Sequence, residues 1–170
     1  MKRILIVAVA AFALVACQQK TKTAEPGAPV AQSEVSKTFM AKVGKEAGVK
    51  VLPSGLAYKV VRSGDATGLK PGPKDEVKVH YEGKLENGTV FDSSYERGAP
   101  AAMPLDRLIP AWQEALQLMR PGDEWILYVP SNLGYGEEGA GGGEIPPGAP
   151  LTFRIELIDV LPGPGRIQQG

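Results

Sequence analysis

The spacing of apolar residues changes along the chain and predicts a helix followed by strands. Between residues 34 and 46, Val35, Phe39 and Val43 recur every four positions, which predicts one short amphipathic helix. From residue 56 onward the apolar and polar positions alternate, which predicts half-buried strands. The alternating segments are residues 56–61, 77–82, 125–129 and 151–157.

Turn-forming residues separate the strand segments, and one pair of them predicts a tight hairpin. Asn87-Gly88 is a strong two-residue hairpin signal, because both residues tolerate the positive φ angles of such turns. It would join a strand at 81–85 to a strand at 89–92. We therefore expect neighbouring strands to pair antiparallel.

Only one strong helix signal interrupts the strands. Pro110 suits a first helical turn, and Trp112, Leu116 and Met119 would share one face of that helix. Arg120-Pro121-Gly122 would end it. Several strands with one helix do not make a βαβ alternation, so we predict an α+β domain in which an antiparallel twisted sheet wraps around one short α-helix.

Three further segments flank the strand-rich part, which we place at residues 51–161. Residues 18–32 lack periodicity and large apolar groups, which predicts a flexible tether, and with the short helix they form a segment at 18–50. Residues 162–170 form a C-terminal tail. Residues 1–17 form the third segment, which precedes the tether.

The first seventeen residues have the pattern of an export signal. A basic start at Met1-Lys2-Arg3 precedes thirteen residues without a polar side chain, a run shorter than the ~20 that span a bilayer. Leu14-Val15-Ala16-Cys17 resembles the lipobox of bacterial lipoproteins, in which the cysteine is acylated. The resemblance implies a lipid at Cys17 and a periplasmic location. Because Gln18 follows, and not aspartate, it favours the outer membrane as anchor; an ordinary signal peptide with a chance cysteine is the alternative.

Charge and cysteine content exclude several classes of function. Residues 51–161 carry ten basic and sixteen acidic side chains, a balance of −6 without a basic cluster, which argues against nucleic-acid binding. Cys17 is the only cysteine, so an internal disulfide, a CxxC redox pair and a thiolate metal site are excluded. We expect no metal and no cofactor.

A glycine-rich segment at residues 133–150 holds seven glycines and three prolines. A Walker-type phosphate loop needs a lysine after its glycines, whereas this segment offers Glu137, Glu138 and Glu144, which would repel phosphate. We interpret it as a flexible loop between strands that carries Tyr135 and Ile145 inward, over a pocket.

Three stretches together resemble the FKBP-type peptidyl-prolyl cis-trans isomerases. They are VHYEGKLENGTVFDSS (79–94), PLDRLIPAWQEALQLMRPGD (104–123) and LGYGEEGAGGGEIPPGAPLTFRIELIDV (133–160). Residues 39–61 are also similar to the junction in bacterial members that carry an N-terminal helical extension. That extension is much shorter here than in dimeric members, so we expect a monomer.

The resemblance implies an apolar substrate pocket with Trp112 as the floor under the prolyl ring. The Tyr135 hydroxyl and the Ile109 N–H would donate to the substrate carbonyl. Asp92 would lie at the pocket wall, held by Tyr81 and Arg97. Asp92, Tyr135 and Trp112 would thus be the catalytic residues, and the substrate-binding residues would be Tyr81, Phe91, Arg97, Met103, Leu108, Ile109, Trp112, Tyr135, Ile145 and Phe153.

This sequence departs from the family pattern at Ala101 and Met103, where the best-known members have aromatic residues. One wall of the pocket is therefore expected to be thinner, which changes substrate preference and leaves the fold intact. Without the resemblance, Trp112 and Phe153 fit a plain hydrophobic core, and Asp92 fits a turn-ending acid.

The implied activity is isomerisation of X–Pro bonds in unfolded or nascent envelope polypeptides. Uncatalysed isomerisation takes roughly tens to hundreds of seconds and can limit folding. The alternative is a non-catalytic chaperone or binding module that grips client segments in the same apolar pocket. A carrier of apolar ligands would need a larger and more continuous cavity.

Overall fold

A computed structural model of the protein describes residues 33–164. The predicted signal peptide, Cys17 and most of the predicted tail lie outside this range. Within it, the order of elements is α1 (Glu34–Val43), β1 (Val49–Val51), β2 (Ala57–Arg62), β3 (Glu76–Leu85), β4 (Val90–Ser93), β5 (Ala101–Pro104), α2 (Pro110–Leu116), β6 (Glu124–Val129) and β7 (Leu151–Leu161). Short 3-10 turns lie at Leu105–Arg107 (η1), Ser131–Leu133 (η2) and Gly141–Gly143 (η3).

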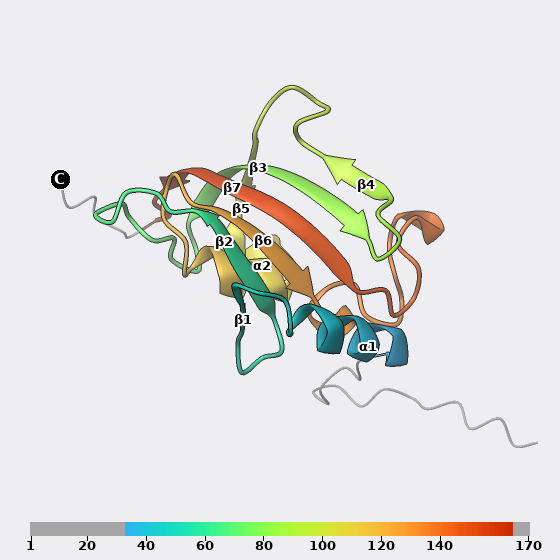
Figure 1. Ribbon diagram of the computed structural model, residues 1–170. Coiled ribbons are helices and arrows are strands. Elements are labelled where there is room, and N and C mark those ends of the chain that lie inside the picture. The colour runs from blue at the N-terminus through green and yellow to red at the C-terminus, as the bar shows by residue number, and fades with distance from the viewer. Residues whose placement is uncertain (1–32, 165–170) are drawn as a thin grey trace, which may run out of the picture.

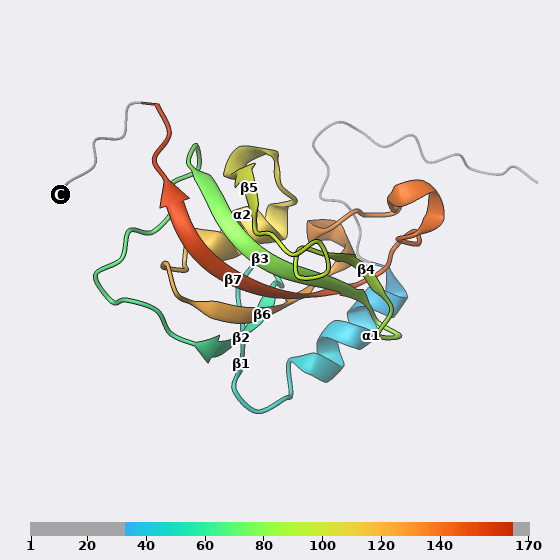
Figure 2. The same cartoon turned by 90° about the horizontal axis from the view of Figure 1, so that it is seen from above.

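The strands form one antiparallel sheet with the order β1-β2-β6-β7-β3-β4. Strand β5 pairs with the first half of β3, while β4 pairs with its second half. Figures 1 and 2 show the sheet curving around α2, with α1 beside the end of β6. The expected α+β architecture is therefore confirmed.

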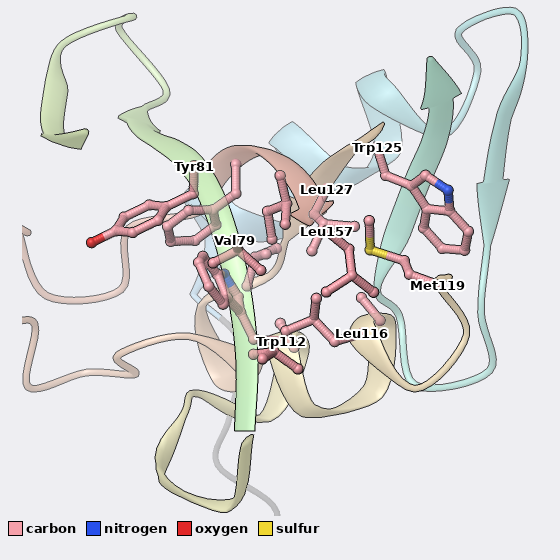
Figure 3. Packing of buried hydrophobic residues seen from close by; sticks show 14 of the residues in the cluster. Val79, Tyr81, Trp112, Leu116, Met119, Trp125, Leu127 and Leu157 are labelled. Atoms are coloured by element: carbon pink, nitrogen blue, oxygen red, sulfur yellow. The ribbon is translucent and has the colours of Figure 1, made fainter. Parts of the chain in front are cut away.

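Alternation along three central strands builds the core. The inward residues of β3, β6 and β7 are buried between the sheet and α2 (Figure 3). Most of their neighbours in sequence are less buried. Burying one face of each strand fixes the register of pairing, because a one-residue slip would turn the apolar set outward. The buried residues of these strands include Val77, Val79, Tyr81, Trp125, Leu127, Val129, Leu151, Phe153, Ile155 and Leu157.

Strand β2 does not follow the predicted alternation to its end. Leu56 and Ala57 are both fully buried although they are neighbours in sequence, and Val60 is 36% exposed. Pairing of β2 with β6 shifts register between Val60 and Arg62, and β1 pairs only with the first three residues of β2. The end of β2 therefore leaves the core, which explains why a strictly alternating interpretation was wrong there.

The helices also differ from expectation in detail. Val35 is 56% exposed, and the fully buried residue of that turn is Ser36. Helix α2 ends at Leu116, earlier than expected, because the next amides bond three residues back: Leu118 N–H to Ala115 and Met119 N–H to Leu116. Met119 is still buried. Within residues 33–164, no helix has the length and apolar character needed to cross a bilayer.

Candidate active site

A cavity of about 290 Å³ opens at one side of α2, between the sheet and the loops that leave it. Side chains from β3, β4, β5, α2, β7 and two loops line it. The lining residues are Tyr81, Phe91, Asp92, Met103, Arg107, Leu108, Ile109, Trp112, Tyr135 and Phe153. Its volume is just below the range of ~300–1,000 Å³ that is typical of ligand pockets. A cavity of this size suits one amino-acid residue of a ligand and the atoms on either side of it.

Aromatic rings meeting edge to face form the floor of the cavity, which we define as Trp112 and Phe153. Trp112 is 4% exposed. Its ring centroid lies 5.2 Å from that of Tyr81, with an angle of 82° between the two ring planes. The rings of Trp112 and Phe153 have a centroid distance of 5.3 Å and an interplanar angle of 87°. For Phe91 and Phe153 these values are 5.7 Å and 90°. Such geometry adds to the stabilisation from burial, because the ring edge is positive and the ring face negative. The floor is thus preformed.

Gly83 on β3 makes room for two of these rings. A Cβ atom at this position would lie 2.5 Å from the Phe91 ring and 2.8 Å from the Phe153 ring. Both distances are far below van der Waals contact, so any side chain here would displace the rings. Glycine at this position is therefore part of the construction of the cavity.

Asp92 lies on β4 at the cavity edge, between Tyr81 and Arg97. The Tyr81 hydroxyl donates to Asp92 Oδ2 at 2.5 Å, Arg97 donates to Asp92 Oδ1, and Arg97 Nη2 donates to the Tyr81 hydroxyl at 2.8 Å. Burial alone would raise the pKa of Asp92, but the hydrogen bonds from Tyr81 and Arg97 and the charge of Arg97 outweigh it. The pKa of Asp92 is therefore lowered, and the carboxylate is charged at neutral pH.

Tyr135 extends over the cavity from the loop between β6 and β7 and is 38% exposed. Burial, and secondly the negative charge of Asp92, raise the pKa of its hydroxyl. The hydroxyl therefore stays protonated and remains a hydrogen-bond donor at neutral pH. No acceptor among residues 33–164 takes this proton.

A backbone donor lies across the cavity at the start of α2. The Ile109 carbonyl caps the helix by accepting from Trp112 N–H at 2.9 Å and Gln113 N–H at 3.1 Å. Gln113 Nε2 also donates to the Leu108 carbonyl at 2.7 Å, which fixes the peptide that precedes Ile109. Within the described part of the chain the Ile109 N–H has no acceptor. Such a preformed donor can bind a carbonyl oxygen of a ligand.

The structure brings together most of the residues that the sequence suggested, with two differences. Arg97 does not line the cavity and contacts it only through Asp92 and Tyr81. Ile145 was expected in the pocket but is not among the residues that line the cavity; it is 6% exposed and belongs to the same core cluster as Trp112 and Phe153. Sequence reasoning missed Arg107, whose only signal was its place beside Leu108.

Two other features of the described residues are weaker candidates for a site. A larger hollow of about 520 Å³ lies between Val35, residues 85–87 and residues 146–150. Among the described residues it holds no aromatic side chain, and Glu86 is its one charged side chain, so the smaller cavity is the better candidate site. No group of three His, Cys, Asp or Glu side chains within residues 33–164 is arranged to hold a metal ion.

Comparison with known proteins identifies the class that this fold and cavity define. The FKBP-type peptidyl-prolyl cis-trans isomerase family matches residues 68–158, and the domain found amino-terminal to such isomerases matches residues 6–60. The chain therefore belongs to the FKBP-type peptidyl-prolyl cis-trans isomerase family.

Individual relatives agree with this assignment. The peptidyl-prolyl cis-trans isomerase Mip of Coxiella burnetii is 51% identical over 75% of this chain and 54% of the relative. The outer membrane protein MIP of Legionella longbeachae is 47% identical over 72% of this chain and 51% of the relative. The crystal structure of a Pseudomonas syringae peptidyl-prolyl isomerase matches with a TM-score of 0.69 and 42% identity, over 75% of this chain and 91% of that one. The chain spans about half the length of the two curated relatives.

Proposed function

We propose that the protein catalyses cis-trans isomerisation of peptide bonds that precede proline, in unfolded or nascent polypeptides of the bacterial cell envelope. Family membership supports the reaction. One observation carries the proposal: the cavity has an aromatic floor and two hydrogen-bond donors, the Tyr135 hydroxyl and the Ile109 N–H. Neither donor has an acceptor among the described residues.

The reaction needs no cofactor and no bond cleavage. Rotation about the amide is slow because resonance is lost at the twisted transition state, a barrier of about 18–20 kcal/mol. Any group that binds the twisted amide better than the planar one accelerates rotation, about tenfold for each 1.4 kcal/mol. A twisted amide is less dipolar than a planar one, so a water-poor aromatic pocket favours it.

Each residue of the cavity then has a defined part. Trp112 and Phe153 hold the prolyl ring by apolar contact, while Tyr135 and the Ile109 N–H bind a substrate carbonyl and hold it during rotation. Asp92 remains charged and orders the edge of the cavity by accepting hydrogen bonds from Tyr81 and Arg97. Arg97 orients Asp92 from outside the cavity.

The decisive test is a proline-limited refolding reaction in the presence of the full-length protein. An isomerase at sub-stoichiometric concentration shortens the slow phase, because each molecule acts repeatedly. A chaperone that only binds client chains would require near-equimolar protein. Acceleration that appears only at equimolar concentration would replace our proposal with the binding-module alternative.

We also propose that the protein is attached to the outer membrane through a lipid on Cys17. The lipobox-like sequence supports this, together with the name of the Legionella longbeachae relative, outer membrane protein MIP. Cys17 lies outside the described residues, so the support comes from sequence alone. We expect Cys17→Ser to accumulate as full-length, unlipidated precursor, measured by intact mass and membrane fractionation. Mature, membrane-bound protein of normal length from that variant would contradict the assignment.

A further inference from the structure

Five residues from three separate stretches form a closed ring of hydrogen bonds at the start of α1. The Ser33 hydroxyl donates to the Gly148 carbonyl at 2.5 Å and accepts from the Ser36 N–H at 3.1 Å. The Gly148 N–H donates to the Gly136 carbonyl, and the Gly136 N–H donates to the Ser131 carbonyl, both at 2.8 Å. The Ser131 N–H closes the ring by donating to the Ser36 hydroxyl at 2.9 Å. We call these five residues the serine ring.

The serine ring is partly buried and tightly fitted, with Ser33 and Gly136 half-buried. Ser36 and Ser131 are fully buried, and the Ser33 N–H adds a bond across the ring to the Ser131 hydroxyl at 3.2 Å. Gly136 and Gly148 have φ angles of 59° and 71°, and a Cβ on Gly148 would lie 2.8 Å from the Cβ of Ser33. Buried polar groups are costly when unpaired, so loss of one bond disturbs the others.

The ring holds the loop that carries Tyr135. Gly136 directly follows Tyr135, while Ser131 and Gly148 lie near the two ends of the loop between β6 and β7. Figure 1 shows α1 beside the end of β6, where this loop begins. Helix α1 lies outside residues 68–158, the part matched by the isomerase family, so the ring joins an N-terminal element to the site.

We propose that Ser33 is a positioning residue for Tyr135. Its hydroxyl fixes Gly148, and through Gly136 it fixes the backbone next to Tyr135, so that the Tyr135 hydroxyl faces the cavity. The inference rests on the proposed isomerase function. A purely structural role predicts a different outcome, since Ser33 is also the N-cap of α1.

Three substitutions at Ser33 in the full-length protein separate capping from positioning. Ser33→Thr keeps both the cap and the donor to Gly148. Ser33→Asp keeps the cap, because its carboxylate accepts from the Ser36 N–H, but it has no proton for Gly148. Ser33→Ala loses both. For each variant, kcat/KM for a prolyl peptide and the midpoint of urea unfolding are measured.

If Ser33 positions Tyr135, Ser33→Asp and Ser33→Ala both lower kcat/KM, by about three- to tenfold, and Ser33→Thr does not. The urea unfolding midpoints then follow a different order from kcat/KM, because only Ser33→Ala removes the N-cap of α1. An activity order that follows the stability order, with Ser33→Asp as active as Ser33→Thr, would overturn the proposal. Ser36→Ala, which removes the acceptor for the Ser131 N–H, should lower kcat/KM similarly.

Thr38→Ala is the matched control on the same helix. Its hydroxyl donates to the Glu34 carbonyl at the exposed surface and takes no part in the serine ring. It should leave kcat/KM unchanged. Amide hydrogen exchange at Gly136 provides a readout without activity: exchange should speed up roughly three- to tenfold in Ser33→Asp relative to Ser33→Thr. Equal exchange rates would refute the ring, whereas a wild-type protein that fails to accelerate refolding would refute only the proposed function.

Discussion

The floor of the cavity and the loop above it are held by different forces. Trp112 and Phe153 are 4% and 3% exposed and project from regular elements, α2 and β7, into a cluster of aromatic rings. Tyr135 is 38% exposed and lies on a loop whose backbone is tied by hydrogen bonds between serines and glycines. Apolar burial therefore secures the floor, and polar contacts secure the loop.

This difference separates stability from activity. A floor residue contributes to the same core that stabilises the fold, so its loss lowers stability and activity together. A loop residue such as Tyr135, which we propose contacts substrate, buries little apolar surface, so its loss is expected to lower activity alone. The four predictions below test this separation.

The largest effect is expected from Trp112→Ala. Loss of a buried indole should cost about 3–5 kcal/mol of unfolding free energy and nearly all isomerase activity, measured by urea unfolding and by refolding assays under conditions where the variant is folded. Trp125→Ala is the matched control, because Trp125 is equally buried but stacks on Tyr58 away from the cavity, at 4.3 Å. It should lose similar stability and retain activity. A folded Trp112→Ala protein with normal turnover would place the floor elsewhere.

Gly83→Ala should have the second-largest effect, because its new methyl group collides with Phe91 and Phe153. We expect a cost of about 1–3 kcal/mol and a marked loss of activity as the rings shift, measured by the same two assays. Gly88→Ala serves as control, since open space surrounds it and only its φ of 86° opposes a side chain. That variant should lose about 1–2 kcal/mol and stay active. Normal activity in Gly83→Ala would show that the ring arrangement is not needed.

Tyr135→Phe should lower kcat/KM with little change in stability. Removal of one hydroxyl should cost about 0.5–1.5 kcal/mol of transition-state binding, a two- to tenfold loss, while the unfolding free energy stays within about 0.5 kcal/mol. Tyr95→Phe is the control, because the Tyr95 hydroxyl is buried without a hydrogen-bond partner in the described chain and lies outside the cavity. Unchanged turnover in Tyr135→Phe would mean that the Ile109 N–H acts alone.

The smallest effect concerns acid stability. The pKa of Asp92 is lowered below its ordinary value of 3.8, so the folded protein binds this proton less readily than the unfolded chain. Its contribution to stability is therefore present above pH 3.8 and is lost as pH falls through the lower, folded-state pKa. Asp92→Asn should lower the urea midpoint at neutral pH and make no difference at strongly acidic pH. An equal deficit at both pH values would show that the Asp92 charge is irrelevant. Because Asp92 and Arg97 are both partly exposed, solvent screens their attraction.

The sequence best predicted the strands that have one buried face and one more exposed face. Strands β3, β6 and β7 each bury alternate residues, so their period of two was visible in the sequence. The predicted inner face of α1 was wrong only at Val35, because the pattern counted apolar residues and ignored Ser36. That serine is buried for its hydrogen bond, a contact that hydrophobicity does not reveal.

Prediction of the candidate site had the same limit, because a contact between distant residues leaves no pattern in the sequence. Its apolar residues came from a resemblance in sequence, and the structure places most of them around one cavity. Ile145 does not line the cavity, and its position could not be predicted because it pairs with Ala140 within a loop without periodicity. The serine ring joins residues 98 and 115 positions apart, so no local pattern could indicate it. The functional roles of the site residues remain predictions.

The position of β7 has a consequence for how the molecule forms. This strand is the last in the described chain and lies in the middle of the sheet, where it pairs with β6 on one side and with β3 on the other. Before β7 arrives, β1, β2 and β6 belong to one ladder and β3, β4 and β5 to another, with no hydrogen bonds joining them. The fold therefore closes only after the chain has been made or translocated past residue 161, and contacts of such large sequence separation form slowly. A protein proposed to hasten the folding of others is built so that its own folding waits for its final strand.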